Sequence, residues 1–244
     1  MMEHWEELCP GGLRFVYDDE LFCPGTDTFL LSSLPRLKKG MRVCDLGCGT
    51  GLLSLLLLQR QRELFVTGVE LQEKAALLAR RSAEENGLDP HLSICCGDLR
   101  QAKNLFPTGS FDLVVCNPPY YAPGSGKTAA SDALCAARSE VTCTLEDVCR
   151  AAAYLLRWGG EFCLVHKPER LTDVLYAMRS HHMEPKRLRF VCPTASAAPS
   201  LILVEGKRGG KSGLSILPPL ILTTPEGTPT DEVEVIYFRK EVPL

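Results

Sequence analysis

The sequence predicts a single α/β domain, residues 1–244, built on a doubly wound, mostly parallel seven-stranded sheet with an antiparallel hairpin at one edge. Two observations carry this prediction. From residue 41 onward, short apolar runs alternate with stretches of helical periodicity, as in parallel strands that are joined by helices. Further along, two apolar runs follow each other across a short loop with no helix between them, which indicates a hairpin.

The expected elements follow from this alternation. Parallel strands are expected at residues 41–47, 64–70, 91–98, 111–117 and 160–166, and the hairpin strands at 186–193 and 200–207. Helices are expected at residues 51–61, 72–87, 144–160 and 168–182. Thr144 is the expected N-cap of the third helix, with Asp147 at the capping-box position, and Pro168 opens the fourth.

The composition is that of a globular protein without membrane contact. Hydrophobic residues make up 45% of the chain and charged residues 23%, which excludes extended disorder, and a net charge of −3 does not predict a nucleic-acid binder. The N-terminus MMEHWEELCPGG lacks the apolar run of a signal peptide, and the run LLSLLLL at 52–58 is too short to span a bilayer. We therefore expect a cytoplasmic protein. No feature specifies an oligomeric state.

The twelve cysteines are expected to be reduced core thiols. None of them forms a Cys-x-x-Cys pair, and most lie within apolar runs, where cysteine behaves as a small buried hydrophobe. Of the five histidines only His181 and His182 are clustered, and neighbouring residues on a helix point in different directions. The sequence predicts no metal site.

Three glycines mark the first turn from strand to helix. Gly47, Gly49 and Gly51 lie where the backbone needs positive φ and where a ligand can approach the N-terminus of the next helix. Glu70 ends the second strand, where a carboxylate can accept both hydroxyls of a ribose. Together the turn and the distant acid predict a nucleoside cofactor.

The fourth strand is followed by Asn117, Pro118, Pro119 and Tyr120. The Asn117 side-chain oxygen and the Pro118 carbonyl are two acceptors that can grip both hydrogens of a planar amino group and direct its lone pair outward. The prolines hold these acceptors in place, and Tyr120 offers a face on which a base can stack. Cys116 is expected in the core, since strand alternation turns it away from Asn117.

Three runs, DLGCGTG (45–51), GVE (68–70) and CCGD (95–98), resemble motifs of class I S-adenosylmethionine-dependent methyltransferases. The resemblance implies a Rossmann-like methyltransferase fold with S-adenosylmethionine as cofactor. It implies that Asp45 lies near the amino-acid moiety, that Glu70 binds the ribose and that Asp98 meets the adenine amino group. The cofactor contacts expected on this basis are Asp45, Gly47, Cys48, Gly49, Gly51, Glu70, Leu71, Asp98, Leu99 and Asn117.

NPPY, residues 117–120, is similar to the motif of methyltransferases that modify exocyclic or amide nitrogens. Further runs at residues 23–34, 136–140, 166–175 and 203–222 resemble the bacterial adenine-N6 methyltransferases that act next to the anticodon of valine tRNA. The resemblance, over about residues 14–240, implies a tRNA substrate. It implies that residues 1–40 cover the cofactor, with contacts from Thr26 and Asp27, and that 207–244 form a C-terminal extension. An ordinary helix cap is an equally good interpretation of Thr26 and Asp27.

Basic residues gather in the segment EGKRGGKSG at 205–213. We hypothesise that Lys207, Arg208 and Lys211 bind RNA phosphates from a loop beside the catalytic edge. A solvated hairpin tip is the alternative interpretation of these residues.

Other functions stay open at this point. The same chemistry fits N5-methylation of a glutamine amide in a translation factor. It also fits methylation of another amino group in RNA. A binding protein that keeps the fold without turnover would not need an intact NPPY motif. A nicotinamide oxidoreductase is disfavoured, because the glycine spacing is G-x-G-x-G and not G-x-G-x-x-G.

Overall fold

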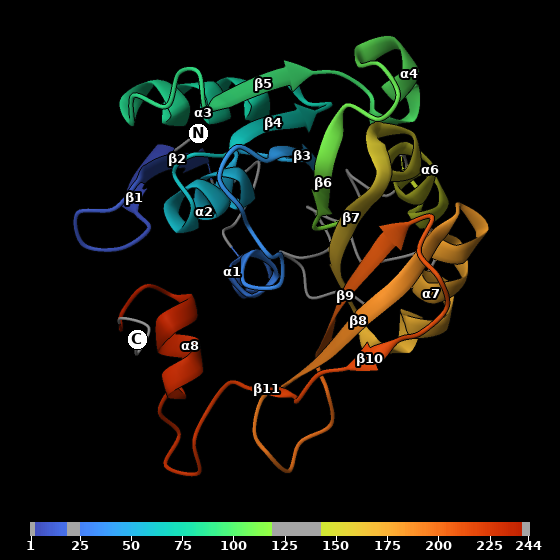
Figure 1. The fold of residues 1–244 in the computed structure, drawn as a ribbon. Helices are drawn as coiled ribbons and strands as arrows, with labels where there is room; N and C mark the ends of the chain where they lie inside the picture. The colour runs from blue at the N-terminus through green and yellow to red at the C-terminus, as the bar shows by residue number, and fades with distance from the viewer. Residues whose placement is uncertain (1–2, 19–24, 119–142, 241–244) are drawn as a thin grey trace.

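The structure, a computed structural model, describes residues 3–18, 25–118 and 143–240 (Figure 1). Its centre is a sheet in which five strands run parallel, in the spatial order β7, β6, β3, β4, β5. Their bounds are β3 Arg42–Leu46, β4 Phe65–Glu70, β5 Leu92–Cys96, β6 Phe111–Cys116 and β7 Leu156–His166. These agree with the predicted strands, except that β7 begins earlier.

The hairpin extends the sheet beyond β7. Strand β9, Leu201–Arg208, runs antiparallel between β7 and β8, Met183–Cys192. Two short strands, β10 (Ser215–Ile216) and β11 (Leu220–Ile221), pair with the outer side of β8, so the described residues form a sheet of nine strands where seven were predicted. The added strands satisfy backbone groups that an edge strand otherwise exposes. The predicted α/β class, with a mostly parallel sheet and an antiparallel hairpin, is confirmed.

Helices cover both faces of the sheet, as Figure 1 shows. One face carries α1 Thr26–Ser32, α2 Leu52–Arg60, α3 Glu73–Glu85 and α8 Asp231–Ile236. The other carries η1 Leu99–Gln101, α4 Ala102–Leu105, α6 Leu145–Leu155, η2 Pro168–Arg170 and α7 Leu171–Ser180. Strand β6 separates the two layers: Leu113 and Val115 pack into the first core, and Val114 and Cys116 into the second. Successive residues of the strand point to opposite faces, and both faces are covered, so the strand is apolar throughout.

The predicted helix 144–160 is wrong at its end. Helix α6 stops at Leu155, and the next residues already belong to β7. Gly159 has a φ of 80°, and a Cβ at Gly160 would lie 3.0 Å from the Asp112 carbonyl oxygen, so this glycine pair serves close strand pairing with β6 and not a helix. The start of the helix is confirmed: Thr144 and Asp147 form a capping box.

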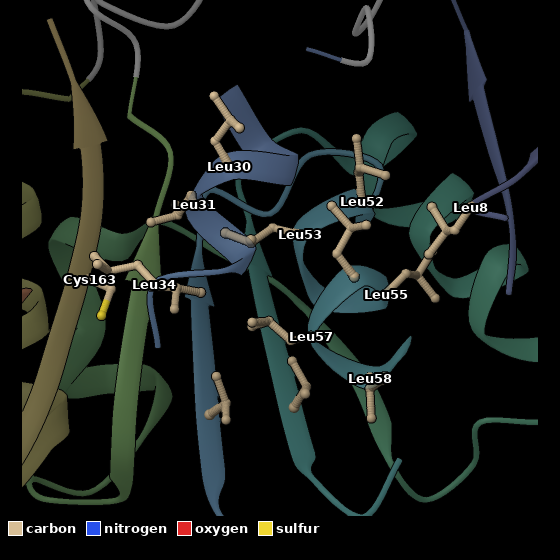
Figure 2. Packing of buried hydrophobic residues seen from close by; sticks show 14 of the residues in the cluster. Leu8, Leu30, Leu31, Leu34, Leu52, Leu53, Leu55, Leu57, Leu58 and Cys163 are labelled. Carbon is tan, nitrogen blue, oxygen red and sulfur yellow. The ribbon is translucent and has the colours of Figure 1, made fainter. Parts of the chain in front are cut away.

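The leucine-rich helix α2 lies at the centre of the first core. Residues 52–58 are all buried, because the sheet covers one side of α2, α1 another and an N-terminal hairpin, residues 3–18, a third. Figure 2 shows Leu8 of that hairpin beside Leu55, with Leu31 and Leu34 of the α1 region directed toward the sheet. A helix that is apolar all round is buried, and α2 with its nine residues is too short to cross a bilayer, so it is a core helix.

The N-terminal hairpin was not predicted. Strands β1 (Glu3–Glu7) and β2 (Arg14–Asp18) form a separate two-stranded sheet that packs on α3. The Val16 N–H donates to the Ser82 hydroxyl at 3.0 Å, which fixes the hairpin on the helix.

Arg60, the last residue of α2, joins both ends of the chain. Its Nε donates to the Ser32 hydroxyl at 3.0 Å, and its guanidinium donates to the Ile236 carbonyl at 2.8 Å. The same guanidinium lies 4.6 Å from the centre of the Phe238 ring. Burial lowers the pKa of Arg60 to about 10. The C-terminal segment, residues 230–240, is therefore tied to α1 and α2.

We expect Arg60→Ala to lower the free energy of unfolding by about 2 kcal/mol, because it removes two hydrogen bonds from a charged donor and leaves the Ile236 carbonyl without this partner. Urea denaturation measures the loss. The control is Arg62→Ala, whose guanidinium bonds only the nearby Gln59 side chain at the surface. Equal stability of the two variants would contradict the role of Arg60.

Candidate functional site

The site forms where the winding of the sheet reverses. From β3 the chain proceeds outward to β4 and β5 and then returns to place β6 on the other side of β3. The β3–β6 pairing sets Asp45 opposite Val115, so Gly47 and Asn117, two residues further along each strand, leave the sheet at the same edge. Ligands of open α/β sheets bind at such a switch point.

The glycine turn has the conformation that the sequence predicts. Gly47, Gly49 and Gly51 have φ values of 70°, 55° and 85°, all in the left-handed region. A Cβ at Gly47 would meet no atom within 4 Å, whereas a Cβ at Gly51 would lie 3.1 Å from the Ala79 Cβ. Gly51 therefore allows α2 to approach α3, and Gly47 leaves open space above the turn.

Glu70 is bound to the glycine turn. Its Oε2 accepts the Gly49 N–H at 2.9 Å and its Oε1 accepts the Gln72 N–H at 2.8 Å. Each carboxylate oxygen can accept a further donor, so ribose hydroxyls fit this group. The adjacent Leu71 is 48% exposed, which presents an apolar side chain at the same edge.

Asp45 lies beneath the turn and is buried. The Ser54 hydroxyl donates to its Oδ2 at 2.7 Å. Burial raises the pKa of Asp45 to about 7, the Ser54 hydrogen bond opposes this rise, and the charge of Glu70 adds to it. A cation held near this carboxyl would favour its ionised form.

Cys48 lies in the turn, but its side chain belongs to the core. A Cβ at Gly68 would lie 2.6 Å from the Cys48 sulfur, so the thiol fills the space that this glycine leaves. Burial raises the pKa of the thiol well above its ordinary value. Cys48 therefore offers a ligand its backbone rather than its sulfur.

Asp98 follows β5 by two residues and caps the short helix η1. It accepts the Arg100 N–H at 2.9 Å, and its carboxylate pairs with the Arg100 guanidinium at 2.6 Å. These bonds lower the pKa of Asp98. Its contact with an adenine amino group stays a prediction, and so does a contact from Leu99, which is half-buried on η1.

Asn117 and Pro118 follow β6 directly. The Asn117 side chain is half-buried, and its Nδ2 donates to the Thr28 hydroxyl oxygen at 3.0 Å. Pro118 is buried, while Pro119 and Tyr120 lie outside the described residues. Cys116 is 2% exposed and packs into the second core, as predicted.

Helix α1 reaches this edge through a residue that sequence reasoning missed. The resemblance predicts contacts from Thr26 and Asp27, but it is Thr28 that contacts Asn117. The Thr26 side chain lies near Tyr237 of the C-terminal segment, where it opposes the rise in pKa that burial causes in this tyrosine. The interpretation of Thr26 and Asp27 as helix caps is wrong, because Gly25 is the N-cap and no side chain caps α1.

His166 ends β7 at the same edge as Asn117. Burial lowers its pKa to about 4, helped by the charge of Arg170, and its Nδ1 accepts the Lys167 N–H at 2.8 Å. A histidine with this pKa is neutral at pH 7 and a weak base. This suits a reaction that needs no strong general base.

The expected location of the basic loop beside the catalytic edge is wrong. Strand β9 is antiparallel to β7, with Ile202 opposite His166 and Lys207 opposite Glu161. Lys207, Arg208 and Lys211 therefore lie at the amino ends of the parallel strands, across the sheet from Asn117. Lys207 and Lys211 are exposed, whereas Arg208 donates to the Leu156 carbonyl.

Within the described ranges, no group of three or more His, Cys, Asp or Glu side chains could hold a metal ion. In the same part of the chain, no helix combines the length and apolarity that crossing a bilayer requires.

Residues 16–181 match the family described as Methyltransferase small domain. The chain belongs to this family. A tRNA1(Val) (adenine(37)-N6)-methyltransferase of Dickeya chrysanthemi is 32% identical over 222 residues, which cover 88% of this methyltransferase and 86% of that enzyme. An enzyme of the same name from Porphyromonas gingivalis is 31% identical over 192 residues, covering 74% and 72% of the two chains. The methyltransferase thus belongs with these enzymes, as its motifs predicted.

Solved structures confirm the Rossmann-like methyltransferase fold. A predicted O-methyltransferase, Atu636 of Agrobacterium tumefaciens, has a TM-score of 0.73 at 23% identity and covers 88% of this chain and 96% of its own. TrmN of Thermus thermophilus has a TM-score of 0.55 at 21% identity, covering 74% of this chain and 48% of its own.

We expect Asp45→Asn to change how stability depends on pH. Because burial raises the pKa of Asp45 to about 7, the folded state binds this proton more tightly than the unfolded state, and wild-type stability falls as pH rises from about 4 to about 7. The variant lacks this loss. Relative to wild type, its free energy of unfolding should rise by at least about 1.4 kcal/mol between pH 5 and pH 8, the equivalent of one pKa unit.

Urea denaturation of the protein without cofactor at both pH values measures this difference. The matched control is Asp173→Asn on α7, whose side chain is 55% exposed. If wild type and Asp45→Asn kept the same stability difference at both pH values, the raised pKa would be refuted.

Proposed function

We propose that this methyltransferase transfers the methyl group of S-adenosylmethionine to the exocyclic N6 of an adenine in tRNA, with the anticodon-loop adenine of valine tRNA as the target. One observation carries the proposal: the parallel pairing of β3 with β6 places Asn117 and Pro118 beside the glycine turn. The names of the curated relatives support the same substrate.

The residues around the turn fit the nucleoside cofactor. Among side chains in the described ranges, the Thr50 hydroxyl is the single buried polar atom without a hydrogen-bond partner, and it lies within the glycine turn. Open space lies above Gly47, and Glu70 holds its carboxylate at the rim. A buried polar atom left without a partner is costly, and a polar ligand at the turn would offset that cost.

Each part of the cofactor has proposed contacts. Asp45 and the turn residues Gly47, Cys48, Gly49 and Gly51 would hold the methionine end. Glu70 would bind the ribose, and Leu71, Asp98 and Leu99 the adenine. Asn117 lies between cofactor and substrate, and Thr26 and Asp27 belong to the N-terminal segment, residues 1–40, that would cover the cofactor. Residues 207–244 are the proposed C-terminal extension.

When bound, S-adenosylmethionine supplies an electrophilic methyl group on a sulfonium sulfur. The Asn117 Oδ1 and the Pro118 carbonyl accept the two hydrogens of the target amino group, whose lone pair is otherwise delocalised into the purine ring. Both acceptors are held before the substrate arrives, since Pro118 fixes its own φ and Asn117 is bonded to α1. The amino nitrogen loses its proton after transfer, so a neutral His166 does not impede the reaction.

The RNA-binding part of the proposal rests on the fact that bases of an anticodon loop are unpaired. An unpaired loop base is extruded more easily than a base in a duplex, and Tyr120 would stack on it. We propose that Lys207 and Lys211 contact phosphates in a part of the tRNA that is remote from the target base. Arg208 would contribute less, because its guanidinium is already bonded to the Leu156 carbonyl. The enzyme would act in the cytoplasm, where its substrate is.

Asn117→Ala should bind S-adenosylmethionine within about twofold of wild type and lose at least about 100-fold in kcat, because a preorganised acceptor at the reacting group is gone. Calorimetry measures cofactor binding, and transfer of labelled methyl groups to unmodified tRNA measures turnover. The exposed Asn104 on α4 supplies the control variant Asn104→Ala. Full activity of Asn117→Ala would refute the mechanism, and label in protein rather than RNA would refute the substrate.

The triple variant Lys207→Ala, Arg208→Ala, Lys211→Ala tests the remote phosphate contacts. We expect weaker tRNA binding with an unchanged kcat at saturating tRNA, because these residues lie across the sheet from Asn117. The slope of affinity against salt should shrink by about 0.7 for each phosphate that the variant no longer neutralises. Unchanged affinity and slope would exclude these residues from RNA binding.

A further inference from the structure

A side-chain amide has a donor end and an acceptor end, and rotation by half a turn exchanges them. Only an Asn117 amide with its oxygen toward the substrate can accept an amino hydrogen. The prolines that follow fix the backbone, but they do not fix this last torsion, which is broad for asparagine. Some other group must select the productive rotation.

We propose that Thr28 is a positioning residue that selects this rotation, and that the C-terminal segment holds α1 where Thr28 can do so. This inference rests on the proposed function. The Asn117 Nδ2 donates to the Thr28 Oγ1 at 3.0 Å, across 89 residues of sequence. With the amide nitrogen held on the Thr28 side, the amide oxygen faces the opposite side.

The environment of Thr28 strengthens this bond. Thr28 is 3% exposed, so water does not compete for its hydroxyl, and a hydrogen bond shielded from water is stronger than one at the surface. Threonine is also a poor helix former. A buried threonine within α1 thus lowers helix propensity and in return provides an acceptor for Asn117.

Helix α1 does not hold this position alone. It has seven residues and no side-chain cap, and a helix that short is not stable by itself. The ring of Phe29 stacks on Tyr237 at 4.5 Å between ring centres, with 2° between their planes, and the Thr26 side chain also lies near Tyr237. Arg60 adds the link from Ser32 to the Ile236 carbonyl. The contacts of α1 with the C-terminal segment therefore flank Thr28 on both sides.

The first test is Thr28→Val, which keeps the shape of the side chain and removes the acceptor. We expect kcat to fall by about 10-fold to 100-fold, with affinities for S-adenosylmethionine and tRNA within about twofold of wild type, because the amide loses its orientation while both binding surfaces persist. Thr28→Ser restores the hydroxyl and should recover most of the loss. Thr172→Val is the matched control, since Thr172 is exposed on α7.

The double variant Thr28→Val, Asn117→Ala separates positioning from a general effect on the fold. It should be no slower than Asn117→Ala, because Thr28 acts through the amide that is already missing. If Thr28→Val does not fold, Thr28→Cys replaces it, since a thiol is a weak acceptor of similar size, and should show the same loss in kcat.

The second test concerns the C-terminal segment. Tyr237→Ala removes the stack on Phe29 and should lower kcat at least about fivefold, with no further loss when it is combined with Thr28→Val. Tyr176→Ala, from a tyrosine on α7 that is 74% exposed, should leave kcat unchanged.

The outcomes separate this inference from the proposed function. Absence of methyl transfer to tRNA by the wild-type enzyme would refute the function itself. Transfer by wild type, loss in Asn117→Ala and a wild-type kcat in Thr28→Val would overturn the role of Thr28 alone. A kcat in Tyr237→Ala equal to that of Tyr176→Ala would overturn the role of the C-terminal segment.

Discussion

The parallel pairing of β3 with β6 is the constraint on which the site depends. Because Asp45 lies opposite Val115, the glycine turn and Asn117 leave the sheet side by side at the same edge. The hydrogen bond from Gly49 to Glu70 then extends this arrangement to β4. Apart from Asp45 and the residues of α1, the site draws on residues at or just after the ends of strands. The strands set the direction and spacing of these residues, and the residues that follow the strands carry the chemistry.

Much of this edge was predictable because its signals are local. Gly47, Gly49 and Gly51 mark a turn that needs positive φ, and a strand that ends in Asn-Pro needs no knowledge of distant residues to be recognised. The order of strands and helices is local in the same sense, since periodicity is a property of ten or twenty residues. Two core layers were likewise implied by strands that are apolar on both faces.

The misses have the opposite origin. Thr28 and Asn117 are 89 residues apart in the sequence, and nothing in the residues around Thr28 distinguishes it from Thr26. The basic loop was assigned to the wrong edge because the location of Lys207 depends on the direction of β9, which is set by where the hairpin inserts. The helical pattern of residues 144–155 continues in the sequence as far as the glycine pair at 159–160. Residues 156–160 nevertheless belong to β7, because this strand pairs with β6.

The contact of α1 with the C-terminal segment has a consequence for folding. Phe29 and Tyr237 are far apart in the sequence, so their stack is a long-range contact. Such a contact closes a long loop, and its formation costs chain entropy that a local contact does not cost. Because α1 is too short to be stable by itself, it gains its fixed position only when the surrounding tertiary structure has formed.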